Sequence, residues 1–471
     1  MGKKPKKSKA ELEEERLAAE EEARKQKIID DKRRAEEEER SRLEALRIAA
    51  ERKAYREAEV ERLASENAAV KELLSDRLNQ MRAEEQAERE SLEWARFREP
   101  TEAVNARNPR DLNTFLTLTA ETVANSMSNA MSVAQEVVQV AKEVDDMWSD
   151  CVGERNDAGR ELAASNVSTC CKLVREKINQ ATAELLKYAD EKLNDKSELL
   201  VESSADGVTV GVWGSYAVMR PIRKSVQFED IGVQIDIPKQ ILAQDTWFVH
   251  RITRLSVDST SYAAYADNGG GASGKYLVGD LIFIDILRPP PQVQGIRAKK
   301  YTVRNVSSAS LSVQECAYPS SVGCRVFIKI PDDIVMSDDM TIAVWDDEAG
   351  DWVDNGISDY QYTDANRTCQ FYLTTVGTFG LVKDRCADLP YKKWTVSPVR
   401  DLGSEFYERY ARVTVQTQRL ELAIDVVGHE VRLLRPSTKQ FKDLIGVLMS
   451  PSQLLRRLQR RGVNIMPANR D

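Results

Sequence analysis

Three hydrophobic patterns follow one another along the chain. Large apolar residues are sparse at the start, and only four occur between residues 11 and 42, too few to cover one face of a helix. From residue 112 apolar residues recur at steps of three and four, and after Gly207 the period changes to two. Because side chains share a helix face every 3.6 residues and a strand face every second residue, helices should precede strands.

Residues 1–99 are predicted to form a charged arm. They carry 25 basic and 27 acidic side chains, and neither Gly nor Pro interrupts residues 6–99, where strong helix formers dominate. We therefore expect one long solvated helix. In its second half six apolar residues and Asn67 fall near a three-four spacing, which fits either one packing contact with the body of the protein or a coiled coil with a partner helix. The apolar residues are Val60, Leu63, Val70, Leu74, Leu78 and Met81.

The first residues hold five lysines within seven positions: Lys3, Lys4, Lys6, Lys7 and Lys9. Such a run is either a solvated tail or a candidate partner-binding segment. In the second case it would attract an acidic polymer surface, such as nucleic acid, anionic lipid or the acidic tails of tubulin.

The remaining 372 residues are predicted to form three further parts. Residues 100–205 should be a helical neck, with one helix capped by Asp111 and running from 112 to 148, and a second from 161 to about 200. Residues 206–398 alternate in ten short stretches between turn clusters, which is typical of an antiparallel sandwich. Residues 399–471 should add a strand pair and two closing helices, over 439–448 and 451–461, with Ser450 as a cap. The ten stretches are 208–219, 225–237, 246–257, 276–287, 300–313, 325–330, 340–345, 357–362, 367–373 and 378–383.

The predicted fold class is therefore α+β. It comprises a long charged N-terminal helix, a helical hairpin, and an antiparallel β-sandwich body with short C-terminal helices.

One motif suggests nucleotide chemistry. Residues 269–275 nearly match the phosphate loop GxxxxGK[ST], and this match keeps a nucleotide-binding enzyme open as an alternative. However, Tyr276 stands where the Mg²⁺-binding hydroxyl belongs, and the residues after it have the pattern of a strand. Since a phosphate loop leads into the N-terminus of a helix, we expect a loop between strands here.

No other pattern points to catalysis, a cofactor or a metal. The two histidines, His250 and His429, lack neighbours suited to a triad or a metal site, and the seven cysteines lack metal-ligand spacing. No stretch approaches 18 consecutive apolar residues, and the charge is balanced, so neither a membrane nor nucleic acid is indicated as a partner of the chain as a whole. We expect a protein that is not an enzyme.

Four residues of the body are candidate partner-binding anchors. Trp and Arg are enriched among residues that dominate interfaces, and Trp247, Arg251, Trp345 and Trp352 are of these types. The alternative is that most of the tryptophans lie in the core of a β-rich body.

Several motifs, in a fixed order along the chain, resemble a known family. Weaker support comes from Trp94 and from residues 112–115. The main motifs are Ser225-Val226-Gln227-Phe228 with 235–243; Val344-Trp345-Asp346, Trp352 and 354–358 with 378–382, 389–391 and Trp394; and 462–467. Together they resemble the cancer-susceptibility-candidate-one family, also called axonemal dynein intermediate chain seven.

The resemblance implies a non-catalytic accessory subunit of inner-arm dynein in the axoneme of a motile cilium or flagellum. It implies a cytoplasmic, cytoskeletal location and a role in beating. The implied partners are tubulin of the doublet microtubule and the intermediate and heavy chains of the inner arm. A structural protein of the microtubule lumen without dynein contact remains an alternative.

Overall fold

The computed structural model describes residues 9–98, 104–195, 197–215, 224–242, 249–260, 262, 274–288, 294–297, 302–305, 314–316, 322–400 and 409–466. The chain divides into two compact units, Met1–Glu99 and Pro100–Asp471.

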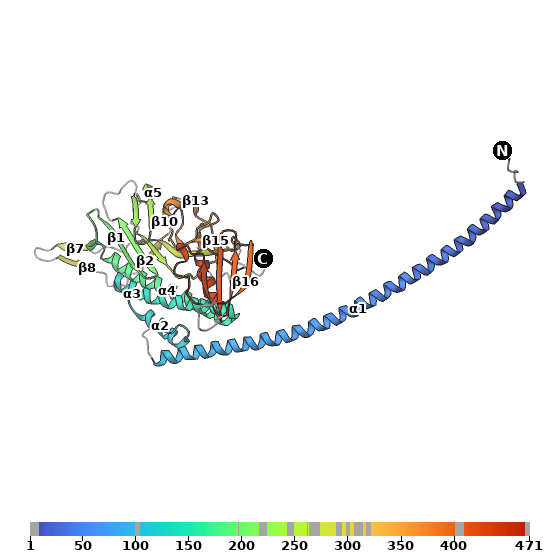
Figure 1. Ribbon diagram of the computed structural model, residues 1–471. Helices are drawn as coiled ribbons and strands as arrows, with labels where there is room; N and C mark the ends of the chain where they lie inside the picture. Colours follow the sequence, from blue (N-terminus) through green and yellow to red (C-terminus); the bar gives the residue numbers. More distant parts are fainter. Residues whose placement is uncertain are drawn as a thin grey trace. The chain divides into compact units, whose positions relative to one another are not determined.

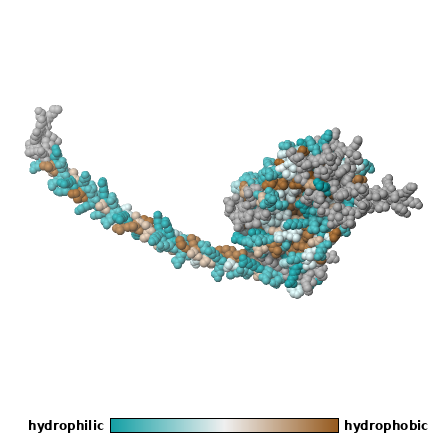
Figure 2. All heavy atoms as spheres, turned by 180° about the vertical axis from the view of Figure 1, so that it is seen from behind, coloured by the Kyte–Doolittle hydropathy of each residue, from teal (hydrophilic) through white to brown (hydrophobic). Residues whose placement is uncertain are grey.

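The first unit contains one helix, α1 (Lys9–Arg98), 90 residues long. At about 1.5 Å per residue it spans roughly 135 Å. Its ion pairs lie three or four residues apart on the exposed helix, as in Arg62–Glu59 and Arg33–Glu37. Figure 2 shows its apolar residues as separate patches between hydrophilic ones. The long solvated helix predicted from the sequence is therefore confirmed.

The second unit begins with a helical layer: α2 (Pro109–Glu121), α3 (Met127–Glu154) and α4 (Asp157–Lys187). A single helix from 112 to 148 was the wrong expectation, because the chain breaks after Glu121 and Ser126 caps a new helix by accepting from the amide of Asn129. The first helix is capped by Asn108 rather than Asp111, since Pro109 already occupies its first position. The second long helix ends at Lys187, well before residue 200.

The largest sheet is antiparallel and has the order β1-β2-β5-β6-β15-β11-β12, with β9 (Gln314–Cys316) paired to β6. Apolar side chains of α2, α3 and α4 form one core with those of β1, β2 and β5, so the helices cover that end of the sheet (Figure 1). The strands are β1 (Glu198–Ala205), β2 (Val208–Ser215), β5 (Val249–Leu255), β6 (Lys275–Arg288), β15 (Gly377–Asp384), β11 (Thr341–Asp346) and β12 (Asp351–Val353).

A second antiparallel sheet has the order β13-β14-β10-β4-β3. Its Phe228, Val326 and Phe371 share a core with Ile284 and Phe379 of the first sheet, so the two sheets form the predicted sandwich. The expected single strand over 225–237 is wrong: Gly232, at φ +71°, turns the chain into the hairpin β3–β4. The strands are β13 (Ile357–Thr363), β14 (Thr368–Leu373), β10 (Cys324–Lys329), β4 (Val233–Ile237) and β3 (Lys224–Phe228).

A third sheet, β16-β17-β18-β19, packs with the C-terminal helix α7 (Pro451–Arg460) around a core of its own. Ser450 caps α7 as predicted, accepting from the amide of Gln453 at 3.2 Å. The expected helix over 439–448 is reduced to the 3₁₀ turn η3 (Lys439–Phe441), because the following backbone pairs with β19 instead. The strands are β16 (Lys393–Arg400), β17 (Arg409–Gln416), β18 (Glu421–Val427) and β19 (Glu430–Arg435).

Five short elements complete the described secondary structure. The strands β7 (Gln294–Arg297) and β8 (Thr302–Asn305) pair with each other. The helix α5 (Lys239–Leu242) follows β4, and the 3₁₀ turns are η1 (Ala189–Glu191) and η2 (Asp364–Asn366).

Buried ion pairs join the layers of this unit. Arg456 of α7 lies 3.5 Å from Asp145 of α3 and 3.2 Å from Asp258, and the hydroxyl of Tyr262 donates to Asp145 at 2.6 Å. Because each charge meets an opposite charge in the interior, these contacts fix how the C-terminal helix meets the helical layer.

A second buried cluster centres on Asp388. Its carboxylate accepts from Lys383 at 2.6 Å, from Arg419 at 2.9 Å and from the amide of Asn464 at 3.0 Å. Burial raises the pKa of Asp388, but these hydrogen bonds outweigh burial and hold the pKa below its usual value. Through these hydrogen bonds the charged carboxylate of Asp388 links β15, the third sheet and the C-terminal segment.

Candidate functional site

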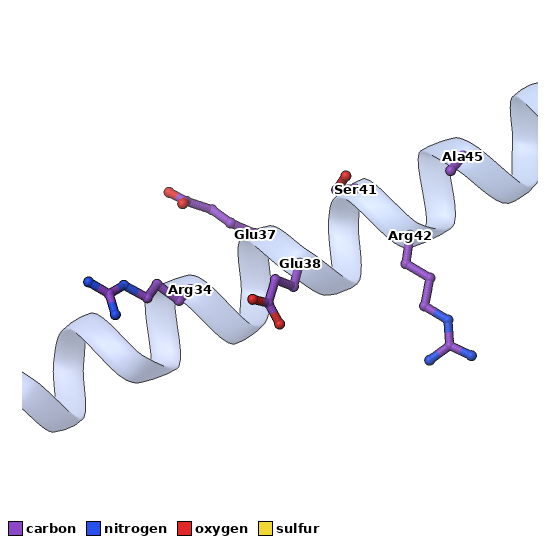
Figure 3. A pocket seen from close by; sticks show the side chains of 6 residues that line it. All are labelled: Arg34, Glu37, Glu38, Ser41, Arg42 and Ala45. Carbon is purple, nitrogen blue, oxygen red and sulfur yellow. The ribbon is translucent and has the colours of Figure 1, made fainter.

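Within the described ranges, no group of three or more His, Cys, Asp or Glu side chains is placed to hold a metal ion. A shallow hollow lies on the surface of α1, but its side chains leave one exposed helix in different directions and enclose nothing (Figure 3). They belong to Arg34, Glu37, Glu38, Ser41, Arg42 and Ala45. This part of the helix is solvated surface rather than a binding pocket.

The two histidines occupy different settings. His250 lies in β5, opposite Trp213 and Ile286, and burial lowers its pKa to about 4. A histidine that stays neutral at physiological pH inside a sheet fits a structural position. His429 lies in the turn between β18 and β19.

Only the end of the Gly-rich loop lies among the described residues. Residues 263–273 lie outside the described part of the chain, whereas Gly274 and Lys275 are described. Lys275 opens strand β6, and its Nζ donates to the carboxylate of Asp354 at 3.0 and 3.2 Å. The segment after the motif is therefore a strand, as predicted, and supplies no helix N-terminus for a phosphate.

Two of the four predicted anchors lie in the interior. Arg251 is only 1% exposed, and its guanidinium donates to Asp285 at 2.6 Å and to Asn179 of α4. Trp352 is 3% exposed and packs edge-on against Trp345, with ring centroids 5.3 Å apart. Arg251 and Trp352 are therefore not surface anchors. The physical reason is that α4 covers Arg251, whereas Trp352 packs in an apolar cluster with side chains of the neighbouring strands.

The other predicted partner-binding residues divide into two groups. Trp345 of β11 is half-buried. Lys3, Lys4, Lys6, Lys7 and Trp247 lie outside the described residues; Lys9 is the first residue of α1, and its side chain is not described. For these residues partner binding stays a prediction.

Strand β16 presents an apolar surface that the sequence analysis missed. Trp394 and Val396 point to the same face and are 66% and 59% exposed. They lie opposite Val415 and Val413 of β17, which in turn lie opposite Leu422 and Ile424 of β18 in the third core. One apolar face thus runs from the core out to an exposed edge strand. Its sequence signal is the alternation of apolar and hydroxyl residues from 394 to 397.

A second surface is acidic. Residues 331–366 contain eleven Asp or Glu and neither Lys nor Arg. All of these acids are exposed except the half-buried Asp346 and Asp351, and they line the turns around β11, β12 and β13. Two cations from outside reach them, Lys275 to Asp354 and Arg367 to Asp332. The segment therefore places a concentration of negative charge on the surface of the body.

A segment within the first half of the sequence matches a described family. Residues 24–217 fit the description "Cancer susceptibility candidate 1 N-terminus". The match begins within α1 and continues through the helical layer into β1 and β2. This part of the chain is therefore similar to the cancer susceptibility candidate 1 family.

Relatives of this family are similar along parts of their length. The protein "Dynein axonemal intermediate chain 7" of Danio rerio is 24% identical over 206 residues, or 40% of this chain and 27% of that protein. The Homo sapiens protein of that name is 25% identical over 204 residues, with the same shares covered. The Macaca fascicularis protein is 20% identical over 328 residues, 67% of this chain and 42% of the relative. The chain thus covers well under two thirds of these relatives.

One solved structure shows a distant likeness. The extracellular region of zebrafish Gpr126/Adgrg6 is 11% identical, with a TM-score of 0.23, over 58% of this chain and 35% of that one. This similarity is too low to indicate a shared fold. Separately, none of the helices in the described part of the chain combines the length and apolar character that a membrane crossing requires.

Proposed function

We propose that this protein is a non-catalytic accessory subunit of inner-arm axonemal dynein. In this proposal it works in the axoneme of cilia and flagella, scaffolds the dynein arm on the doublet microtubule and modulates beating. Its partners are tubulin and the intermediate and heavy chains of the inner arm. The microtubule lumen, without dynein contact, is the competing location.

One observation carries the proposal: residues 24–217 match the family, and the similar proteins share the name of an axonemal dynein intermediate chain. This match covers most of α1 and the whole helical layer. The segment that matches the family thus comprises most of the long helix α1 and the helical layer that packs on the first sheet of the sandwich.

The architecture supports a scaffold. A helix roughly 135 Å long extends far beyond the width of a small domain, and about half of its residues are charged. The body adds two surfaces of different chemistry, the apolar face of β16 and the acidic segment 331–366. Such a chain can connect partners at a distance without reacting with either.

The test is recovery from axonemes. We would tag the full-length chain in a ciliated cell, isolate axonemes, extract them with graded salt and identify co-purifying chains by mass spectrometry. Co-purification with inner-arm heavy and intermediate chains is expected. Tight association with tubulin alone, together with density inside the tubule wall, would support the luminal alternative and contradict our proposal.

A truncation separates the roles of the two units. Removing residues 1–99 should leave the body folded, because residues 100–471 form a compact unit with their own cores, but should weaken retention in axonemes. The matched control replaces α1 with a helix of equal length and composition in shuffled order. If the truncated chain is retained as strongly as the full chain, the arm is not a tether.

A further inference from the structure

The second half of α1 carries an exposed apolar stripe, which we call the seam: Val60, Leu63, Asn67, Val70 and Leu74. Its four apolar side chains are all exposed, although each would be buried on one face of a packed helix. Steps of three and four average 3.5 residues per turn. This period keeps one stripe facing a partner helix in a left-handed supercoil.

We propose that the seam pairs with the seam of a second copy of this chain, parallel and in register. The proposal does not rest on the dynein assignment. It rests on the order of the residues along and beside the seam, because that order fits this arrangement better than the reverse one.

Asn67 is the first reason. In a parallel pair each residue of the seam meets its own counterpart, so the two Asn67 amides can bond to each other. A single buried Asn of this kind sets register and favours two strands. In an antiparallel pair Asn67 would face an apolar residue, and a buried amide without a partner is costly.

The charges beside the seam are the second reason. Glu59, Glu66 and Leu73 lie along one edge, and Ala64, Lys71 and Leu78 lie along the other. In a parallel pair Glu66 of one copy meets Lys71 of the other, twice by symmetry, and Leu73 meets Leu78. In an antiparallel pair the edge with Glu59 and Glu66 would face itself, which places like charges together.

The single helix already positions the acidic edge. Arg62 donates to Glu66 at 2.6 Å and to Glu59 at 2.5 Å. The hydrogen bond from Arg62 lowers the pKa of Glu59, and both contacts hold their carboxylates alongside the seam. Because Arg62 lies outside the seam, it can keep these contacts when a second helix docks.

The seam is short, so the pairing should be weak. Beyond Leu74 the next apolar residue is Leu78, four residues on. Two steps of four in succession break the alternation of three and four, and such a break locally unwinds the supercoil. Between residues 11 and 42 large apolar residues are too sparse to extend the seam. Association is therefore expected only at high protein concentration or when another assembly holds two copies close together.

Cross-linking tests the geometry directly. In the full chain with the exposed Cys386 changed to Ser, Leu63→Cys should oxidise to a disulfide-linked dimer at least about tenfold faster than Ser65→Cys. Ser65 lies two residues on and points away from the seam, so it is the matched control. Equal rates for the two variants would overturn a parallel, in-register pair.

Sedimentation equilibrium of the full chain tests the energetics. Leu74→Asp should raise the dimer Kd at least about tenfold, whereas Leu43→Asp, at an equally exposed apolar site outside the seam, should leave it unchanged. Glu66→Lys should weaken the dimer, and adding Lys71→Glu should restore it. Circular dichroism checks that each arm remains helical.

Three results would overturn the proposal: a monomer at the highest concentration reached, a dimer that Leu74→Asp leaves intact, or a trimer. Because these measurements use the purified chain alone, their failure says nothing about dynein association. The axoneme experiment in turn does not depend on dimerisation.

Discussion

The arm and the body solve the problem of stability in opposite ways. In α1 the apolar side chains are exposed, and the stabilising contacts are backbone hydrogen bonds and ion pairs open to solvent. In residues 100–471 the stabilising contacts lie in apolar cores, and ion pairs such as Lys383–Asp388 are buried as well. The same residue types therefore carry different energetic weight in the two units.

The comparison shows where substitutions should matter. An exposed ion pair contributes little, because water screens both charges before and after folding. A buried ion pair contributes little as a pair, but losing one partner leaves an uncompensated charge in the interior. Changes in the body should thus be severe and cooperative, and changes in the arm should be small and local.

The largest effect is expected at Asp388. Asp388→Asn removes the anion that faces the buried Lys383 and should lower the free energy of unfolding by about 3–5 kcal/mol. The matched control is Asp354→Asn, which breaks the more exposed pair with Lys275 and should cost at most about 1 kcal/mol. Urea unfolding followed by tryptophan fluorescence measures both. Similar shifts for the two variants would remove the distinction between buried and exposed pairs.

Two tryptophans of the body give the next comparison. Trp352→Ala should cost about 3–4 kcal/mol, because the ring fills the cluster beside Trp345. Trp394→Ala should change stability by no more than about 0.5 kcal/mol, because most of that ring is in water. The thermal unfolding midpoint of each variant checks this. A large loss for Trp394 would mean that the face of β16 is packed in solution.

The sequence predicted elements well where one period dominates. The strands β10 and β14 alternate between buried and more exposed residues, and α1 is helix-forming throughout. Prediction from the sequence failed where pairing between strands, rather than local propensity, decides the structure. Strand β1 begins with Glu198-Leu199-Leu200, a favourable helix sequence, but all eight of its residues pair with β2.

The same limit applies to the candidate surfaces. Alternation gives the faces of a strand, but not what covers each face. Arg251 is buried because Asp285 and Asn179, from β6 and α4, meet it inside the body, and no local pattern signals partners so far along the chain. Trp394 is exposed because β16 is the edge of its sheet, which depends on strand order.

Low pH should reduce the stability of the body, rather than that of the arm, through His250. Its pKa of about 4 in the folded protein lies below the ordinary 6.5, so the unfolded chain binds the additional proton between these values. Stability from this group is complete above pH 6.5 and is lost as pH falls towards 4, by about 3 kcal/mol. Urea midpoints across this range should show the slope, and His250→Gln should reduce it. An unchanged slope would mean that other groups cause it.

The smallest effect is expected in the arm, at Ala45. Ala45→Gly keeps the exposed helix free of new contacts but lowers helix propensity by about 1 kcal/mol. Because α1 belongs to a separate unit, amide exchange should accelerate around residue 45 while the unfolding midpoint of the body stays constant. The matched control, Ala134→Gly in α3, removes a fully buried methyl group as well and should lower that midpoint. A shift of the body's midpoint by Ala45→Gly would show that the arm and the body unfold together, which would contradict the division on which the comparison depends.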